Sequence, residues 1–281
     1  MLIGLLMVGG GIAAGAFGSL LGLGGGVLIV PLLTLGFGLP LREAVGVSLI
    51  CVIMTSSAAA GVYLERHIAN LRLGMTLELF TATGALIGAS IAFLLSEQLL
   101  SLLFAALLLY VAVTMLRAGS PEGDLDPDDE PERAEGSDPG AAFPRRTIVE
   151  RLSGDGYRVR NLGRGLLGSI VAGLASALFG IGGGIVKVPV MHLVMGVPLR
   201  IATATSNLMI GITAAASAVI YAIHGGIDVF VAGPTAIGVF VGATAGSRFG
   251  HRVDLRYLRW LFVIVLVYTA VQMLLRLVNG A

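Results

Sequence analysis

The sequence has few charged residues, one cysteine and one lysine. Charged side chains make up 12% of its 281 residues and hydrophobic side chains 56%. A soluble domain of this length carries about a quarter charged residues. The mean hydropathy of +0.92 and the long uncharged runs therefore exclude a soluble globular protein. Several runs reach the roughly 20 apolar residues that a helix needs to cross a bilayer, which predicts an all-α polytopic membrane protein.

The scarcity of reactive groups also excludes several classes of function. Cys51 is the only cysteine, so neither an intrachain disulfide nor a thiolate metal cluster is expected. The sequence has no HExxH motif, no Walker motif, no nucleophile elbow with partners and no dinucleotide fingerprint at a strand–helix junction. We therefore predict that the protein is not an enzyme, binds no cofactor or metal, and has no nucleic-acid partner.

The chain contains two copies of one segment, 158 residues apart. Residues 15–48 align without a gap on residues 173–206, and 15 of the 34 positions are identical. Both copies read G-x4-L-x-G-x-G-G-G-x3-V-P, and the offset persists through Pro40/Pro198 and Gly84/Gly242. Two copies of an apolar segment broken by glycines are typical of secondary transporters, and the broken segments indicate where the substrate binds.

Each copy is predicted to form four to five hydrophobic helices. In the first half the segments are 2–22, 26–38, 41–64, 74–95 and 98–117. In the second half they are 162–180, 184–196, 199–223, 228–249 and 256–277. The second segment of each half follows a glycine run and is too short to cross the bilayer alone. It is predicted to be a half-helix or one arm of a re-entrant hairpin.

The loop charges predict that the two halves are inverted. Arg66 and Arg72 follow the third segment of the first half, but the equivalent loop of the second half has no Lys or Arg. The loop before the fifth segment shows the opposite bias, with four arginines in the second half only (Arg248, Arg252, Arg256 and Arg259). Equivalent loops then lie on opposite sides of the membrane under the positive-inside rule. A parallel arrangement of four plus four helices is the alternative.

A solvated linker separates the halves. Nine of the 17 acidic residues lie between Glu122 and Asp138, in a stretch without apolar periodicity. We therefore divide the chain into a first membrane repeat (1–117), an acidic linker (118–160) and a second membrane repeat (161–281). Arginines near the end of the linker place it in the cytoplasm.

The glycine runs are the first candidate binding elements, namely Gly24, Gly25 and Gly26 in one half and Gly182, Gly183 and Gly184 in the other. Glycine lets the backbone approach a ligand closely. A helix that begins after such a run directs its free N–H groups and its positive dipole end at that ligand. Two such elements meeting at mid-membrane would bind an anion. The alternative is that these glycines only allow close packing between helices.

Lys187 is the second candidate, because it is the only lysine and lies in the broken element of the second half. A cation at bilayer depth is costly unless it faces water, a carboxylate or an anion. Lys187 is therefore expected either to pair with an anionic substrate or to extend its ammonium to the interface.

Further polar residues, some of them at equivalent positions of the two copies, are also candidate site residues. Ser48 and Ser206 recur in the third segment, with Asn207 beside the second, and they either bind substrate oxygens or bond a neighbouring helix. Arg42 and Arg200 also recur, and they either anchor the helix at the interface or line an access vestibule. Glu78 and His192 could each carry a coupling proton.

The doubled G-x-G-G-G-x3-V-P element, with four to five segments per half, resembles the TauE/SafE (TSUP) family of membrane proteins. The resemblance covers nearly the whole chain outside 118–160. It implies a multi-pass permease in a prokaryotic cell membrane. Family members are associated with export or uptake of sulfite, sulfonates such as sulfoacetate, and other small organic anions, so the resemblance implies a class of substrate and no single one.

The sequence thus predicts a secondary transporter for small organosulfur or organic anions, working by alternating access and coupled to a proton or sodium ion. An anion channel with the same glycine-lined site is the alternative. A structural membrane scaffold is the third possibility. The predicted partners are the anion and the lipid bilayer.

Overall fold

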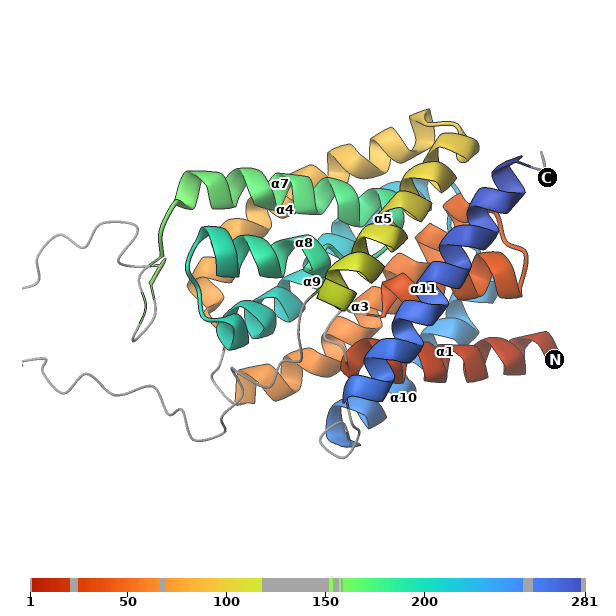
Figure 1. Ribbon diagram of the computed structural model, residues 1–281, viewed down its shortest axis with the longest axis horizontal. Helices are drawn as coiled ribbons and strands as arrows, with labels where there is room; N and C mark the ends of the chain where they lie inside the picture. Colours follow the sequence, from red (N-terminus) through yellow and green to blue (C-terminus); the bar gives the residue numbers. More distant parts are fainter. Residues whose placement is uncertain are drawn as a thin grey trace, which may run out of the picture.

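The computed structural model describes residues 2–20, 25–65, 69–117, 152–153, 157, 159–249 and 255–278 (Figure 1). In this part of the chain all regular structure is helical. The first half comprises α1 (Leu2–Leu20), α2 (Gly26–Pro31), η1 (Leu32–Gly36), α3 (Leu41–Glu65), α4 (Leu71–Leu94) and α5 (Glu97–Arg117). The second comprises α7 (Leu162–Phe179), α8 (Gly184–Pro189), η2 (Val190–Val194), α9 (Leu199–Ile223), α10 (Val229–Phe249) and α11 (Leu255–Val278). The predicted segments are confirmed, with ends shifted by a few residues.

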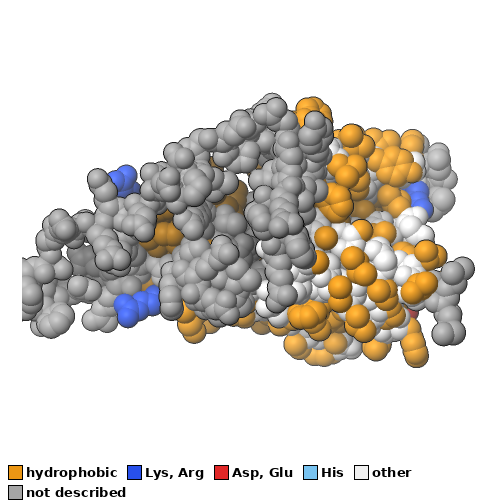
Figure 2. Space-filling model, turned by 90° about the horizontal axis from the view of Figure 1, so that it is seen from below, with side chains coloured by type: hydrophobic (Ala, Val, Ile, Leu, Met, Phe, Trp, Pro, Cys, Tyr) orange, Lys and Arg blue, Asp and Glu red, His pale blue; other side chains and the backbone are white. Residues whose placement is uncertain are grey.

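The helices have the length and surface of membrane-spanning elements. Six of the described helices are long and apolar enough to cross a bilayer. Large hydrophobic side chains point outward along them, for example Phe230 at 90% exposure and Leu94 at 83%. Figure 2 shows such side chains across the described surface on the right of that view. A soluble protein rarely exposes so much contiguous apolar surface. The predicted all-α polytopic membrane fold is confirmed.

The two halves interlock through equivalent helix pairs. In the first pair α1 packs along α10, and in the second α7 packs along α4. Gly15 on α1 lies against Val239, and its equivalent Gly173 on α7 lies against Thr81, which is the equivalent of Val239. A Cβ at either glycine would overlap the partner's backbone. Small residues therefore let the halves pack backbone to backbone, as they do in lipid.

The equivalent helices run in opposite directions in Figure 1. Helix α1 runs from the right of the view toward the centre, whereas α7 runs from the left toward the centre. The central pair α3 and α9 and the outer pair α5 and α11 each join one helix from each half. The contacts repeat at the offset of 158 residues, so equivalent helices make equivalent contacts in the described part of the bundle.

The second segment of each half is a short broken helix, as its sequence predicts. Gly25 and Gly183 precede α2 and α8 in the left-handed conformation, with φ of 73° and 77°. Pro31 and Pro189 end the α-helical turns, and π-helical turns continue to Gly36 and Val194. Proline supplies no N–H for the helical ladder, which accounts for the break. A helix of this length spans about 16 Å, roughly half of the hydrocarbon thickness.

The end of the predicted linker is packed against the bundle. Residues 118–151 lie outside the described residues, but Leu152 and Val159 are buried beside Leu73 and Met195. The Asn70 amide donates to the Leu152 carbonyl and to the Tyr157 hydroxyl, and the Arg160 N–H donates to the Met195 carbonyl. The segment just before α7 therefore lies against the start of α4 and the end of η2.

Candidate anion site

The two glycine elements meet where α3 and α9 pack together. Gly26 at the start of α2 lies directly against the Gly180 carbonyl and Ile181, which precede α8. Gly182 lies between Val52 of α3 and Ile210 of α9, and these two side chains are themselves repeat equivalents. The structure therefore brings the two broken helices together, as predicted. Gly24 lies outside the described residues.

Ser48 holds the two elements together. Its buried hydroxyl donates to the Gly180 carbonyl over 2.7 Å and lies 3.4 Å from the Gly26 carbonyl. One hydroxyl thus contacts the backbone of both broken elements, one from each half of the chain. Of the two predicted roles for Ser48, this contact is the bond to a neighbouring segment.

Ser206 has the equivalent position but different contacts. Its side chain is 1% exposed, and its hydroxyl has no hydrogen-bond partner within the described part of the chain. The hydroxyl is 3.7 Å from the place where a Cβ on Gly184 would stand. Buried polar groups are nearly always paired, and the Ser176 hydroxyl, on α7, likewise has no partner within the described part of the chain. Asn207 is also buried, and its backbone carbonyl accepts from Ser56.

Lys187 lies in a buried ion pair. Its ammonium donates to Glu78 Oε2 over 3.0 Å and to the Thr213 hydroxyl, and that hydroxyl donates to Glu78 Oε1 over 2.6 Å. Lys187 is 2% exposed and Glu78 4%. The expectation that the ammonium extends to the interface is therefore wrong. Both residues are candidates from the sequence, but their pairing could not be predicted. No local sequence pattern shows that α4 packs against α8 and α9.

The ion pair is not repeated at the equivalent positions of the two halves. At the offset of 158 residues, Ile29 corresponds to Lys187 and Ala236 to Glu78, while Thr55 corresponds to Thr213. The repeats therefore share the broken helices and serines but differ in charge. The charged triad therefore occurs on α4, α8 and α9 and is not repeated on α10, α2 and α3.

The other predicted residues have structural partners. Arg42 donates to the Leu95 carbonyl over 2.8 Å, at the end of α4, and its guanidinium lies 5.3 Å from the centre of the Phe93 ring. A cation at the negative end of a helix dipole stabilises that end, which agrees with an anchoring role. The side chain of its equivalent, Arg200, is not among those described. His192 Nδ1 lies 2.9 Å from the Val197 carbonyl.

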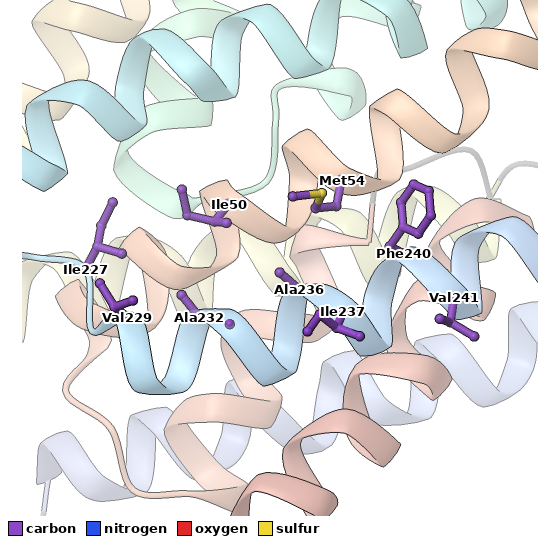
Figure 3. A pocket seen from close by; sticks show the side chains of 10 residues that line it. Ile50, Met54, Ile227, Val229, Ala232, Ala236, Ile237, Phe240 and Val241 are labelled. Carbon is purple, nitrogen blue, oxygen red and sulfur yellow. The ribbon is translucent and has the colours of Figure 1, made fainter.

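An apolar groove of about 540 Å³ lies apart from these residues, between α3 and α10 (Figure 3). Ile50 and Met54 line one side, and Val229, Ile237 and Phe240 line the other. All the side chains that line it are apolar, so it offers an anion no partner. Within the described residues, no group of three or more His, Cys, Asp or Glu side chains could hold a metal ion.

The fold and these contacts define a class of protein: a multi-pass helical membrane protein built from two repeats whose broken helices meet at the centre. The model of the family "Sulfite exporter TauE/SafE" matches residues 7–273, so the chain belongs to this family. The resemblance noted in the sequence is thereby confirmed.

Two relatives align with this chain over almost the whole length of both chains. The chain is 26% identical over 273 residues to "Probable membrane transporter protein YunE" of Bacillus subtilis, covering 94% of both chains. It is also 26% identical over 272 residues to a "Probable membrane transporter protein" of Xylella fastidiosa strain 9a5c, covering 95% of this chain and 93% of the relative. These relatives are named as transporters and not as enzymes, in agreement with the sequence analysis. No solved structure gives a significant match.

Proposed function

We propose that this protein is a secondary transporter of the prokaryotic cell membrane that moves small organosulfur or organic anions, such as sulfite, sulfonates or sulfoacetate, by alternating access. The observation that carries the proposal is the meeting of two broken helices, from oppositely directed halves, at the centre of the bundle. Secondary transporters with inverted repeats bind their substrates at such points. The relatives' names, as probable membrane transporters, support the same class.

The anion would bind between the two glycine elements. The N–H groups after Gly24–Gly26 and Gly182–Gly184 would donate to its oxygens, and the Ser206 hydroxyl and Asn207 amide would complete the shell. Ser48 would fix the spacing of the two elements through its contact with Gly180 and Gly26. Lys187 lies one turn beyond Gly184 on the same broken helix and supplies the positive charge.

Val52 and Ile210 close this site in the present conformation. Both are fully or almost fully buried and pack on Gly182 from opposite helices. Rocking of one half against the other would separate these side chains and open the site to one side at a time. The close packing leaves no continuous path past these residues in this conformation, and the channel alternative is tested by transport measurements.

Binding measurements on the purified protein test the proposal. Sulfite, thiosulfate, sulfoacetate, taurine and lactate are added one at a time, and the thermal unfolding temperature and dissociation constant are measured. At least one sulfur-containing or carboxylate anion should stabilise the protein, because a ligand that binds only the folded state raises its stability. Stabilisation by none of the five would contradict the proposal.

The inverted orientation is tested with topology reporters. A reporter inserted at Ser96, just before α5, and one inserted near Arg252, just before α11, occupy equivalent positions of the two halves. We expect them to report opposite sides of the membrane, as scored by an enzyme reporter pair active on one side only. Signals from the same side would support the parallel alternative.

The paired serines give a matched test of the anion site. Ser206→Ala removes a hydroxyl that bonds nothing in the described structure, so the unfolding temperature should hold or rise while anion affinity falls about 5- to 10-fold, the equivalent of about 1 to 1.5 kcal/mol. Ser48→Ala removes a bond between the two broken elements and should lower the unfolding temperature. Equal anion affinity in the wild type and Ser206→Ala would remove Ser206 from the site.

A further inference from the structure

The ion pair between Lys187 and Glu78 joins the candidate anion site to a group that can bind a proton. Glu78 lies on α4 of the first half, whereas Lys187 and Thr213 lie on α8 and α9 of the second half. We propose that this triad couples the transport of each anion to one proton: the anion takes the ammonium of Lys187, and Glu78 takes a proton. The inference rests on the proposed function and names its coupling ion and coupling residue.

The charges of the buried pair limit what can bind beside it. Glu78 as a carboxylate and Lys187 as an ammonium sum to zero, and both are buried. Addition of a monovalent anion alone would leave a net negative charge in a site that excludes water. Burial of an uncompensated charge costs several kcal/mol. If one proton binds the Glu78 carboxylate and forms a carboxylic acid, the anion pairs with the ammonium and the site stays neutral at every step.

The geometry allows this exchange of partners. Lys187 begins one turn after Gly184, and its long, flexible stem lets the ammonium move between Glu78 and an anion at the glycines. On α9, Ser206, Ile210 and Thr213 follow at helical spacing on one buried face, so the anion site and the triad lie along the same line. The Thr213 hydroxyl contacts both members of the pair and remains a partner for Glu78 when the ammonium leaves.

Glu78 is the only carboxylate on the helices that surround it. The other charged or titratable side chains on α4, α7, α8, η2 and α9 are Arg72, Arg164, His192, Arg200 and Tyr221. Tyr221 bonds the Ala177 carbonyl and His192 contacts the Val197 carbonyl, so each has a partner outside the pair. The segment before α7, which packs at the start of α4, adds Tyr157 and Arg160, and the Tyr157 hydroxyl accepts from the Asn70 amide. Arg164 is exposed near the start of α7. At the equivalent positions the second half has Ala236 and the first half Ile29, and neither side chain carries a charge, which predicts one coupled proton per cycle and not two.

The test measures proton uptake during anion binding. The purified full-length protein in weak buffer is titrated with a monovalent anion, either lactate or sulfite at a pH at which hydrogen sulfite predominates, and protonation of the anion itself is subtracted with a protein-free titration. About one proton should be taken up per anion bound, and the dissociation constant should rise about tenfold per pH unit where Glu78 is ionised in the empty state. Binding without proton uptake would overturn the inference and leave the proposed function standing. If none of the five anions of the thermal unfolding measurements binds, both fall.

Two variants assign the proton to Glu78. Glu78→Gln imitates the protonated side chain, so anion binding should persist, proton uptake should vanish, and the dissociation constant should become independent of pH. In liposomes this variant should exchange anion for anion but should not accumulate anion in response to a pH gradient. His192→Gln is the matched control, since it removes the neighbouring titratable group of η2, and it should keep the proton uptake of the wild type.

A double variant covers the case in which Glu78→Gln does not fold. The double variant Glu78→Gln/Lys187→Met replaces the ion pair with two neutral side chains of similar volume, which buried sites tolerate well. It should fold, lose proton uptake and bind the anion at least 10-fold more weakly than the wild type. Retention of proton uptake in either Glu78 variant, or its loss in His192→Gln alone, would overturn the assignment.

Discussion

Replacement of Gly26 by alanine should abolish the folded, binding-competent protein. A Cβ on Gly26 would overlap the Gly180 carbonyl oxygen and stand 2.8 Å from Val52 Cγ2 and 3.0 Å from the Ile181 Cα. Two of these contacts are with backbone, which cannot move without separating the two broken helices. We expect a loss of about 3 kcal/mol or more in stability. The measurements are the yield of monodisperse protein, its thermal unfolding temperature and its anion affinity.

Gly36→Ala is the matched control on the same broken helix. The nearest heavy atom to its new Cβ is Leu32 Cδ1 at 3.8 Å, an ordinary contact. Neither Gly26 nor Gly36 has a positive φ, so the two substitutions differ in packing and not in backbone strain. Gly36→Ala should unfold at or slightly above the temperature of the wild type. Equal behaviour of the two variants would contradict the close approach of the broken helices.

Lys187→Met should destabilise the protein strongly, by about 3 to 5 kcal/mol. The substitution leaves Glu78 buried without its cation, and removal of one partner of a buried ion pair has costs of this size. From the sequence alone, where Lys187 is taken as an unpaired buried charge, the same variant is expected to keep or gain stability. The structure reverses that expectation because it supplies the partner. Thermal unfolding of Lys187→Met and the wild type decides between them.

The double variant again supplies the control. Glu78→Gln/Lys187→Met removes both charges, so it should recover most of the unfolding temperature that Lys187→Met loses. The two substitutions are then strongly non-additive. Additive losses would mean that the ion pair does not form in the membrane protein, and the proposed proton coupling would lose its basis.

Much of the fold follows from the sequence because it rests on local composition and on repetition. The ends of the helices, the short second segment of each half and its break at glycine and proline all depend on residues within a few positions. The offset of 158 residues also correctly matched the helices of the two halves. The contacts between halves were not predictable in this way, since no local pattern shows that α1 packs on α10 and α7 on α4.

In the candidate site, too, the local features could be predicted from the sequence and the long-range contacts could not. Glycine runs and repeated serines mark the broken elements, and the structure brings these elements together. The different contacts of Ser48 and Ser206 could not be predicted, because the sequence places them at equivalent positions. The pairing of Glu78 with Lys187 joins residues 109 positions apart in sequence and from different halves. Glu78, the only acid of the segment 74–95, and Lys187, the only lysine, were the available signal. Their apolar surroundings indicate that each needs a partner, but they do not identify it.

Counterflow in liposomes tests the central claim most directly. Vesicles containing the purified protein are loaded with unlabelled sulfite or sulfoacetate and diluted into a trace of the labelled anion. An alternating-access transporter exchanges one for the other, so the label should accumulate transiently above its equilibrium level and then decay. Lys187→Ala vesicles should show little accumulation. Rapid equilibration without an overshoot, carried by a measurable anion current, would establish a channel, and the absence of any flux that depends on the protein would contradict a transport function altogether.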